Sequence, residues 1–207
     1  MQQNAKAKMM KYVGSKIAAM AIIAAAVSSL AANAEPAGMQ NCTWCHGRSV
    51  QGYGPAPRLA GQQVLYIESQ LRALAGHLRD NPASKQYMWG VANLSPGAAR
   101  DLAHYLSTIY PKAADDGDQA LAAAGRAIYE SGNPQANIVS CAVCHGPKGQ
   151  GIRQIPRVAG LSYYYLKRRL KQWGEGYHAA AVPMPQVARS LPPRIIEQLA
   201  SYLSYVK

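Results

Sequence analysis

The sequence reads CTWCH at residues 42–46 and CAVCH at residues 141–145. The two stretches contain all four cysteines of the 207-residue chain, and a histidine follows each second cysteine. This is the pattern that attaches c-type haem: two thiols about one helical turn apart can form thioethers with both haem vinyl groups, and the histidine then lies beneath the iron. The sequence therefore predicts two covalently bound haem c groups, attached through Cys42, Cys45, Cys141 and Cys144, with His46 and His145 as proximal iron ligands.

Three other uses of the four cysteines explain less of the pattern. A zinc site could employ two Cys-x-x-Cys pairs, but it needs no histidine after each pair and would join pairs 99 residues apart. A thioredoxin-like redox pair requires a strand–helix setting, and no run of β-branched residues is present to form the strands. Structural disulfides leave both histidines unexplained.

The first 34 residues have the layout of a secretory signal peptide. Four lysines precede an apolar stretch from Ile17 to Leu30, and the small-residue run Ala32-Asn33-Ala34 follows it. The apolar stretch is shorter than the roughly 20 residues that a membrane-spanning helix needs. We therefore expect residues 1–34 to be removed and the mature chain to work in the periplasm, where bacteria attach c-type haem; an uncleaved N-terminal anchor is the alternative.

The charge of the mature chain is basic. Residues 1–34 hold four of the 22 Lys and Arg and none of the 10 Asp and Glu, so 18 basic side chains remain against 10 acidic ones, a formal +8. A basic surface on an electron carrier favours docking to acidic sites on partner proteins, although it also serves solubility alone. We expect redox proteins of the periplasm or membrane as donor and acceptor, no nucleic acid, and membrane contact only through partners.

A tandem repeat sets the domain organisation. The segment PRLAG at residues 57–61 recurs as PRVAG at residues 156–160, and LAHYL at residues 102–106 recurs as LASYL at residues 199–203. The stretch 111–117 between the copies is polar and rich in turn formers. The sequence thus predicts a first domain over 35–110, a linker over 111–117 and a second domain over 118–207.

Apolar periodicity predicts that both domains are helical, which makes the fold all-α with two tandem haem-binding domains. In the first domain a helix is expected over Val64–Leu74, and another over Ala99–Ile109 after the start signal Ser95-Pro96. The corresponding apolar positions of the second domain are Leu166, Leu170 and Trp173, then Ile195, Ile196, Leu199 and Leu203 after Pro192-Pro193.

The second axial ligand of each iron decides between electron transfer and catalysis. Met39 lies too close to Cys42 to reach the opposite face of a haem, which leaves Met88 and Met184, one in each domain and each followed by Val-Ala at the third and fourth positions. Core packing is the common role of methionine, but matching places in the repeat favour iron ligation. Among the other histidines His178 is the main rival, and we expect it at the surface because its counterpart in the repeat is not a histidine.

These features together resemble the dihaem class I cytochromes c of the cytochrome c4 type, over nearly the whole mature chain. The shared motifs are two haem motifs each followed by glycine, the Pro-x-[Leu/Val]-Ala-Gly segments, a Met ahead of Val-Ala and a Leu-Ala-x-Tyr-Leu terminal helix. The resemblance implies two packed cytochrome c domains that shuttle electrons between redox complexes, with His46 and Met88 on one iron and His145 and Met184 on the other.

The first domain departs from this family pattern at its start. Class I domains normally begin with a helix that crosses the last helix, and the second domain has one at Leu121–Tyr129, where Gly125 allows close approach. After cleavage the first domain keeps only residues 35–41 before its first haem cysteine. We expect this helix to be missing or much shortened, with the first haem more exposed, unless the mature chain starts further upstream.

Three functions follow from these expectations. The first is a mobile dihaem electron carrier whose two His/Met irons leave no substrate site, so that it is not an enzyme. The second is a peroxidase-like haem enzyme, which needs an open or exchangeable axial position such as a weakly held Met88. The third is a dedicated electron-transfer subunit of a dehydrogenase or oxidase complex.

Overall fold

The computed structural model describes residues 35–207, and the predicted signal peptide at residues 1–34 lies outside the described residues. Helices form all the regular structure between residues 35 and 207, apart from three isolated β-bridges. This confirms the all-α prediction. In the same range no helix combines the length and the apolar character that a membrane span requires.

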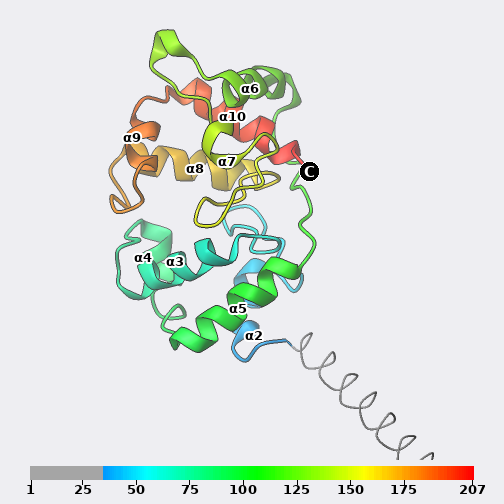
Figure 1. The fold of residues 1–207 in the computed structure, drawn as a ribbon, viewed down its shortest axis with the longest axis vertical. Coiled ribbons are helices and arrows are strands. Elements are labelled where there is room, and N and C mark those ends of the chain that lie inside the picture. The colour runs from blue at the N-terminus through cyan, green and yellow to red at the C-terminus, as the bar shows by residue number, and fades with distance from the viewer. Residues whose placement is uncertain (1–34) are drawn as a thin grey trace, which may run out of the picture. The chain divides into compact units, whose positions relative to one another are not determined.

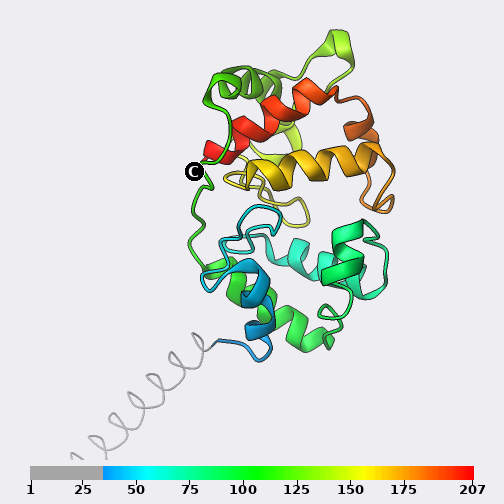
Figure 2. The same cartoon turned by 180° about the vertical axis from the view of Figure 1, so that it is seen from behind.

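The helices fall into two groups that follow the repeat. Residues 36–110, here called the first half, contain α2 (Met39–His46), α3 (Val64–Ala75), α4 (Pro82–Tyr87) and α5 (Pro96–Thr108). Residues 118–207, the second half, contain α6 (Gln119–Ser131), the 3₁₀ turn η1 (Pro134–Ala136), α7 (Ala142–His145), α8 (Tyr163–Gly174), α9 (Met184–Arg189) and α10 (Pro193–Tyr205). In Figures 1 and 2 the helices of the second half lie above those of the first half, one group for each copy of the repeat.

Local sequence explains where the long helices begin. Ser95 caps α5 because its hydroxyl oxygen accepts a hydrogen bond from the Ala98 N–H at 3.2 Å, and Pro96 occupies the first helical position, where no N–H is needed. Proline also starts α10, at Pro193. The helices expected over Val64–Leu74 and after Ser95-Pro96 are thus confirmed as α3 and α5, and those expected in the second half as α8 and α10.

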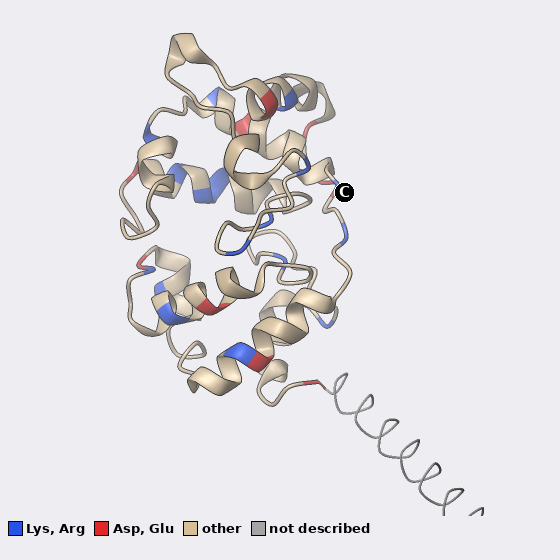
Figure 3. Cartoon of the chain, in the orientation of Figure 1, with Lys and Arg blue, Asp and Glu red and all other residues tan. Residues whose placement is uncertain are grey.

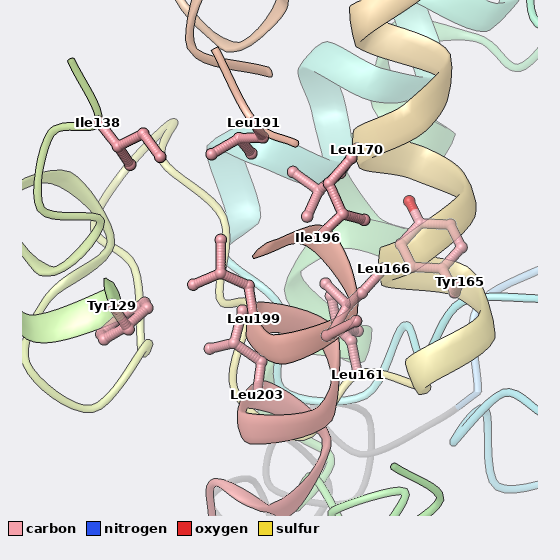
Figure 4. Close-up of a cluster of buried hydrophobic side chains, with 11 residues drawn as sticks. Tyr129, Ile138, Leu161, Tyr165, Leu166, Leu170, Leu191, Ile196, Leu199 and Leu203 are labelled. Carbon is pink, nitrogen blue, oxygen red and sulfur yellow. The ribbon is translucent and has the colours of Figure 1, made fainter. Parts of the chain in front are cut away.

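The core of the second half lies where α10 packs against α6 and α8. Figure 4 shows side chains of α8 and α10, among them Leu170 and Ile196, gathered in this cluster. Gly125 makes the crossing of α6 over α10 possible, because a Cβ added there would lie 1.9 Å from the carbonyl oxygen of Gln198. The role predicted for Gly125 in close helix approach is therefore confirmed.

The core of the first half is smaller and is built where α3 packs against α5. Its buried members are Met39, Val50, Ala60, Ile67, Leu102, Ala103 and Leu106. Met39, at the start of α2, is only 2% exposed. A methionine close to the haem motif therefore serves this core as an adaptable apolar filler.

The two terminal helices of the halves are covered differently. On α10, Ser201 is fully buried beneath the linker and α6, and its hydroxyl accepts a hydrogen bond from the Asp118 N–H at 3.2 Å. The counterpart of Ser201 on α5 is His104, which is exposed. Between residues 36 and 41 the chain forms only a turn and the first residues of α2, so the described part of the first half has no counterpart of α6.

The predicted linker at residues 111–117 has no regular structure but follows the surface of the second half. The Ala114 N–H donates to the Gly160 carbonyl at 3.1 Å, and the Asp115 N–H donates to the Ser204 carbonyl at 3.1 Å. The Asp116 carboxylate accepts hydrogen bonds from the Ser162 hydroxyl at 2.8 Å and from the Tyr163 N–H at 2.7 Å. The segment is therefore anchored at the start of α8.

Candidate functional site

Each haem motif lies on a short helix. In the first half, α2 carries Cys42, Cys45 and His46; in the second, Cys141 caps α7, which carries Cys144 and His145. All four thiols are free, and in each motif the first cysteine is half-buried while the second is exposed. One helical turn between the thiols presents both of them to the same side of a flat ligand.

The two motif histidines are buried and held in the same way. His46 is 5% exposed, and its Nδ1 donates to the Pro57 carbonyl oxygen at 2.7 Å. His145 is 8% exposed, and its Nδ1 donates to the Pro156 carbonyl oxygen at 3.0 Å. A hydrogen bond of this kind sets the ring orientation and the tautomer, and it leaves Nε2 as the nitrogen that can bind a metal.

The repeated Pro-Arg-x-Ala-Gly segments supply these two carbonyls, a role that the sequence did not reveal. A tight loop returns each segment to its histidine: the Gly52 N–H donates to the His46 carbonyl at 2.9 Å, and the Gly151 N–H donates to the His145 carbonyl at 2.8 Å. Both glycines have positive φ, and a Cβ on Gly151 would lie 2.4 Å from the Ile155 carbonyl oxygen. The loop therefore requires glycine at these positions.

Burial controls the protonation of the site. It lowers the pKa of both His46 and His145, which favours the neutral ring that a metal requires. Burial also raises the pKa of the Cys42 thiol, and it raises that of Cys141 to about 11. These thiols lack the lowered pKa of a redox-active Cys-x-x-Cys pair, which argues against the thioredoxin-like alternative.

The two candidate methionine ligands occupy different local structures. Met184 is the first residue of α9, and it packs with Cys141 against the core cluster of the second half. Met88 follows the last residue of α4, where its N–H donates to the Ser84 carbonyl at 3.0 Å. Both side chains are half-buried. The structure therefore brings Met184 and a haem cysteine to one core, whereas Met88 lies outside the core cluster of residues 36–110.

The prediction that His178 lies at the surface is wrong. Its side chain is 3% exposed, and its ring Nδ1 accepts a hydrogen bond from the Arg169 guanidinium at 2.5 Å. Its backbone N–H donates to the Asp80 carboxylate at 2.7 Å. The burial comes from contacts with the first half, which periodicity within the second half could not reveal. Burial, followed by the neighbouring Arg169 charge, lowers the pKa of His178 to about 4.

The residues present fit a haem in each half. Each half offers two free thiols on one helical turn, a neutral buried imidazole with Nε2 available, and apolar side chains that contact the first thiol of the motif. In the second half the buried indole N–H of Trp173, on α8, has no hydrogen-bond partner within the described chain. Such a donor suits the polar edge of a large, mainly apolar cofactor.

The family model for cytochrome c matches residues 30–109 and matches again over residues 122–207. The chain belongs to the cytochrome c family. It is a dihaem cytochrome c similar to cytochrome c4, with two tandem domains, two covalently bound haem c groups and a function in electron transfer.

Known cytochromes resemble this dihaem cytochrome c along most of its length. A cytochrome c-552 of Acidithiobacillus ferridurans is 35% identical over 184 residues, which cover 87% of this chain and 80% of the relative. A thiosulfate dehydrogenase electron acceptor of Thiomonas intermedia is 34% identical, over 69% of this chain and 67% of the relative. The solved cytochrome c4 of Acidithiobacillus ferrooxidans superposes with a TM-score of 0.75 at 34% identity, covering 80% of this chain and 98% of that one.

Proposed function

We propose that this dihaem cytochrome c is a periplasmic electron carrier and not an enzyme. Cys42 and Cys45 attach the first haem, and His46 and Met88 ligate its iron. In the second domain the haem cysteines are Cys141 and Cys144, and the iron ligands are His145 and Met184. The domain boundaries proposed with them are 35–110 and 118–207, joined by the linker 111–117.

The observation that carries this proposal is the pair of matching histidine sites. A buried imidazole directly follows each Cys-x-x-Cys pair, and in both halves its Nδ1 donates to a proline carbonyl eleven residues further along the chain. Bound haem supplies reversible one-electron chemistry at iron. The chain itself orients the imidazoles and keeps water away from them.

Charge supports docking to acidic partner proteins. Figure 3 shows Lys and Arg along α8, and the accessible basic side chains of this helix are Lys167, Arg168 and Lys171. Basic side chains around an electron-transfer protein steer acidic partners to it. Relatives described as thiosulfate dehydrogenase electron acceptors favour a thiosulfate-oxidising enzyme as one donor, either in passing contact or as a subunit partner.

The optical spectrum of the oxidised protein tests the ligand assignment. The weak charge-transfer band from methionine sulfur to ferric iron should have the intensity of two haems. Met88→Ala and Met184→Ala should each remove half of this band and open one iron to carbon monoxide. Leu78→Ala, an exposed site in the first half, is the control. Unchanged spectra in both methionine variants would contradict the assignment.

One observation favours a second function for the first half alone. Met88 lies outside the apolar cluster of that half, whereas Met184 packs into its own. A less firmly held methionine can leave the iron and admit a small ligand, as a peroxidase-like enzyme requires. Carbon monoxide or peroxide binding to one haem of the unmodified protein would support this function over the closed carrier.

A further inference from the structure

Gln62 of the first half makes two hydrogen bonds to the backbone of a single residue in the second half. Its side-chain Oε1 accepts from the Arg157 N–H at 2.7 Å, and its Nε2 donates to the Arg157 carbonyl oxygen at 2.9 Å. Gln62 is only 7% exposed. The Gln63 N–H donates to the same Oε1 at 2.9 Å and helps to hold the side-chain amide in place.

The peptide that Gln62 contacts is the one that holds the proximal histidine of the second domain. The Arg157 N–H and the Pro156 carbonyl belong to one peptide group, and that carbonyl accepts the hydrogen bond from His145 Nδ1 at 3.0 Å. Hydrogen bonds in series polarise one another, so an acceptor at the N–H end makes the carbonyl end a stronger acceptor. Gln62 is therefore connected to His145 through one rigid peptide plane.

The repeat shows that the His145 site has this connection and that the His46 site has no equivalent of it within the described chain. Gln62 corresponds, 99 residues later, to Leu161, which is 6% exposed and belongs to the core cluster of the second half. A leucine side chain can neither accept from nor donate to the Arg58 backbone. The His46 site, whose Pro57 carbonyl is the counterpart of that of Pro156, therefore lacks such a contact within the described chain.

We propose that Gln62 is a positioning residue that lowers the reduction potential of the second haem relative to the first. By strengthening the Pro156 carbonyl as an acceptor, it strengthens the bond from His145 Nδ1 and makes the imidazole a more basic ligand. A more basic ligand stabilises ferric over ferrous iron. The inference rests on the proposed ligation of the second iron by His145, and it assigns to the contact between the halves a part in setting the direction of electron flow.

Redox titration of the full-length dihaem protein, followed by NMR signals of each haem, tests the proposal. Gln62→Met removes both hydrogen bonds at similar volume, and it should raise the potential of the second haem while the first stays unchanged. Gln63→Met is the matched control, because the neighbouring Gln63 also crosses between the halves, to the Gln150 carbonyl at 3.0 Å, without touching the Pro156 peptide. It should move neither potential.

Gln62→Glu separates polarisation from simple contact between the halves. Glutamate keeps an oxygen that accepts from the Arg157 N–H but cannot donate to the Arg157 carbonyl, so the second potential should stay low or fall further. In the ferrous protein the His145 Nδ1–H resonance should move upfield in Gln62→Met and not in Gln62→Glu, with that of His46 unchanged in both.

Two results would overturn the proposal. One is an equal shift of both haem potentials in Gln62→Met, which would indicate a general loss of contact between the halves. The other is an unchanged second potential in a folded Gln62→Met protein. Failure of the ligand assignment would be seen earlier, because the unmodified protein would then show no haem-shifted ring signals from His145.

Discussion

The guanidinium of Arg58 donates a hydrogen bond to the carbonyl oxygen of Gly160, 2.9 Å away and 102 residues further along the chain. The same side chain donates to the carbonyls of Ala159 and, at 2.5 Å, of Lys112, and it is only 4% exposed. Burial, followed by the nearby Arg157 charge, lowers the pKa of Arg58 to about 10, which still leaves it charged at neutral pH. One cation from the first half thus joins the linker and the second half.

Arg58→Met should weaken the association of the halves. It leaves three carbonyls without their charged donor, and the loss in unfolding free energy should be about 3 kcal/mol. Urea denaturation followed separately at the two haems would show one transition in the unmodified protein and two in the variant. Arg48→Met removes an exposed arginine of the same half and should leave a single transition. Coincident transitions in Arg58→Met would show that other contacts are sufficient.

Gly125→Ala should destabilise the second half. The new methyl group would meet the Gln198 carbonyl oxygen, so α6 must move away from α10 at a cost of about 3 kcal/mol. Gly97→Ala is the matched helical control, because a Cβ at Gly97 meets no atom within 4 Å. Its stability should stay within about 1 kcal/mol of the parent, as helix propensity alone predicts. Thermal unfolding measures the stability of both variants. Equal melting temperatures for Gly125→Ala and Gly97→Ala would contradict the close crossing of α6 and α10.

His178 should make stability depend on pH. Its folded pKa of about 4 lies below the ordinary 6.5 because of burial and the charges of Arg169 and Arg79, which outweigh Asp80. Between these two pKa values His178 binds a proton in the unfolded chain but not in the folded chain. The free energy of unfolding should therefore fall as pH drops from about 6.5 to about 4. His178→Asn suits the positive φ of 54° and does not titrate, so it should flatten this part of the profile. Identical profiles would contradict the assignment.

Asp116→Asn should loosen the linker at the start of α8. An amide keeps one acceptor oxygen in place of two, so either the Ser162 hydroxyl or the Tyr163 N–H loses its partner, at a cost of about 1 kcal/mol. Asp115→Asn removes the same charge from the preceding residue, which is exposed, and should be neutral. Chemical denaturation of the two variants measures the contribution of the Asp116 hydrogen bonds to the free energy of unfolding. Equal losses of stability in Asp116→Asn and Asp115→Asn would indicate an effect of net charge instead.

Sequence predicted what depends on local pattern and on repetition. The haem motifs, the apolar faces of α3, α5, α8 and α10, and the glycine of the α6–α10 crossing follow from spacing within one copy. The short helices α4 and α9 escaped prediction because six residues carry too little periodicity. Their bounds place Met88 at the end of one helix and Met184 at the start of the other, a difference that equal spacing to Val-Ala concealed.

Sequence could not predict what depends on the meeting of the two halves. His178 was expected at the surface because its counterpart in the repeat is not a histidine, whereas its partners Arg169 and Asp80 come from α8 and from the other half. Gln62 drew no attention for the same reason, although one signal was available: a polar residue stands where the other copy has Leu161. In a tandem repeat, a buried position that is polar in one copy and apolar in the other indicates a contact between the copies.

The bonds of Arg58, Gln62 and Gln63 have a consequence for how this chain tolerates mutation. Each begins at a side chain of the first half and ends on the backbone of the linker or of the second half. Every amino acid provides a carbonyl oxygen, so the exposed Lys112 and Gln150 can change identity without losing their part of the interface. Ala159 is fully buried, and a Cβ on Gly160 would lie 2.7 Å from the Arg58 guanidinium, so these two acceptors have no room for a larger side chain. Saturation mutagenesis of these contacts should thus find Arg58, Gln62 and Gln63 of the first half strict, and residues 112 and 150, which they bind, permissive.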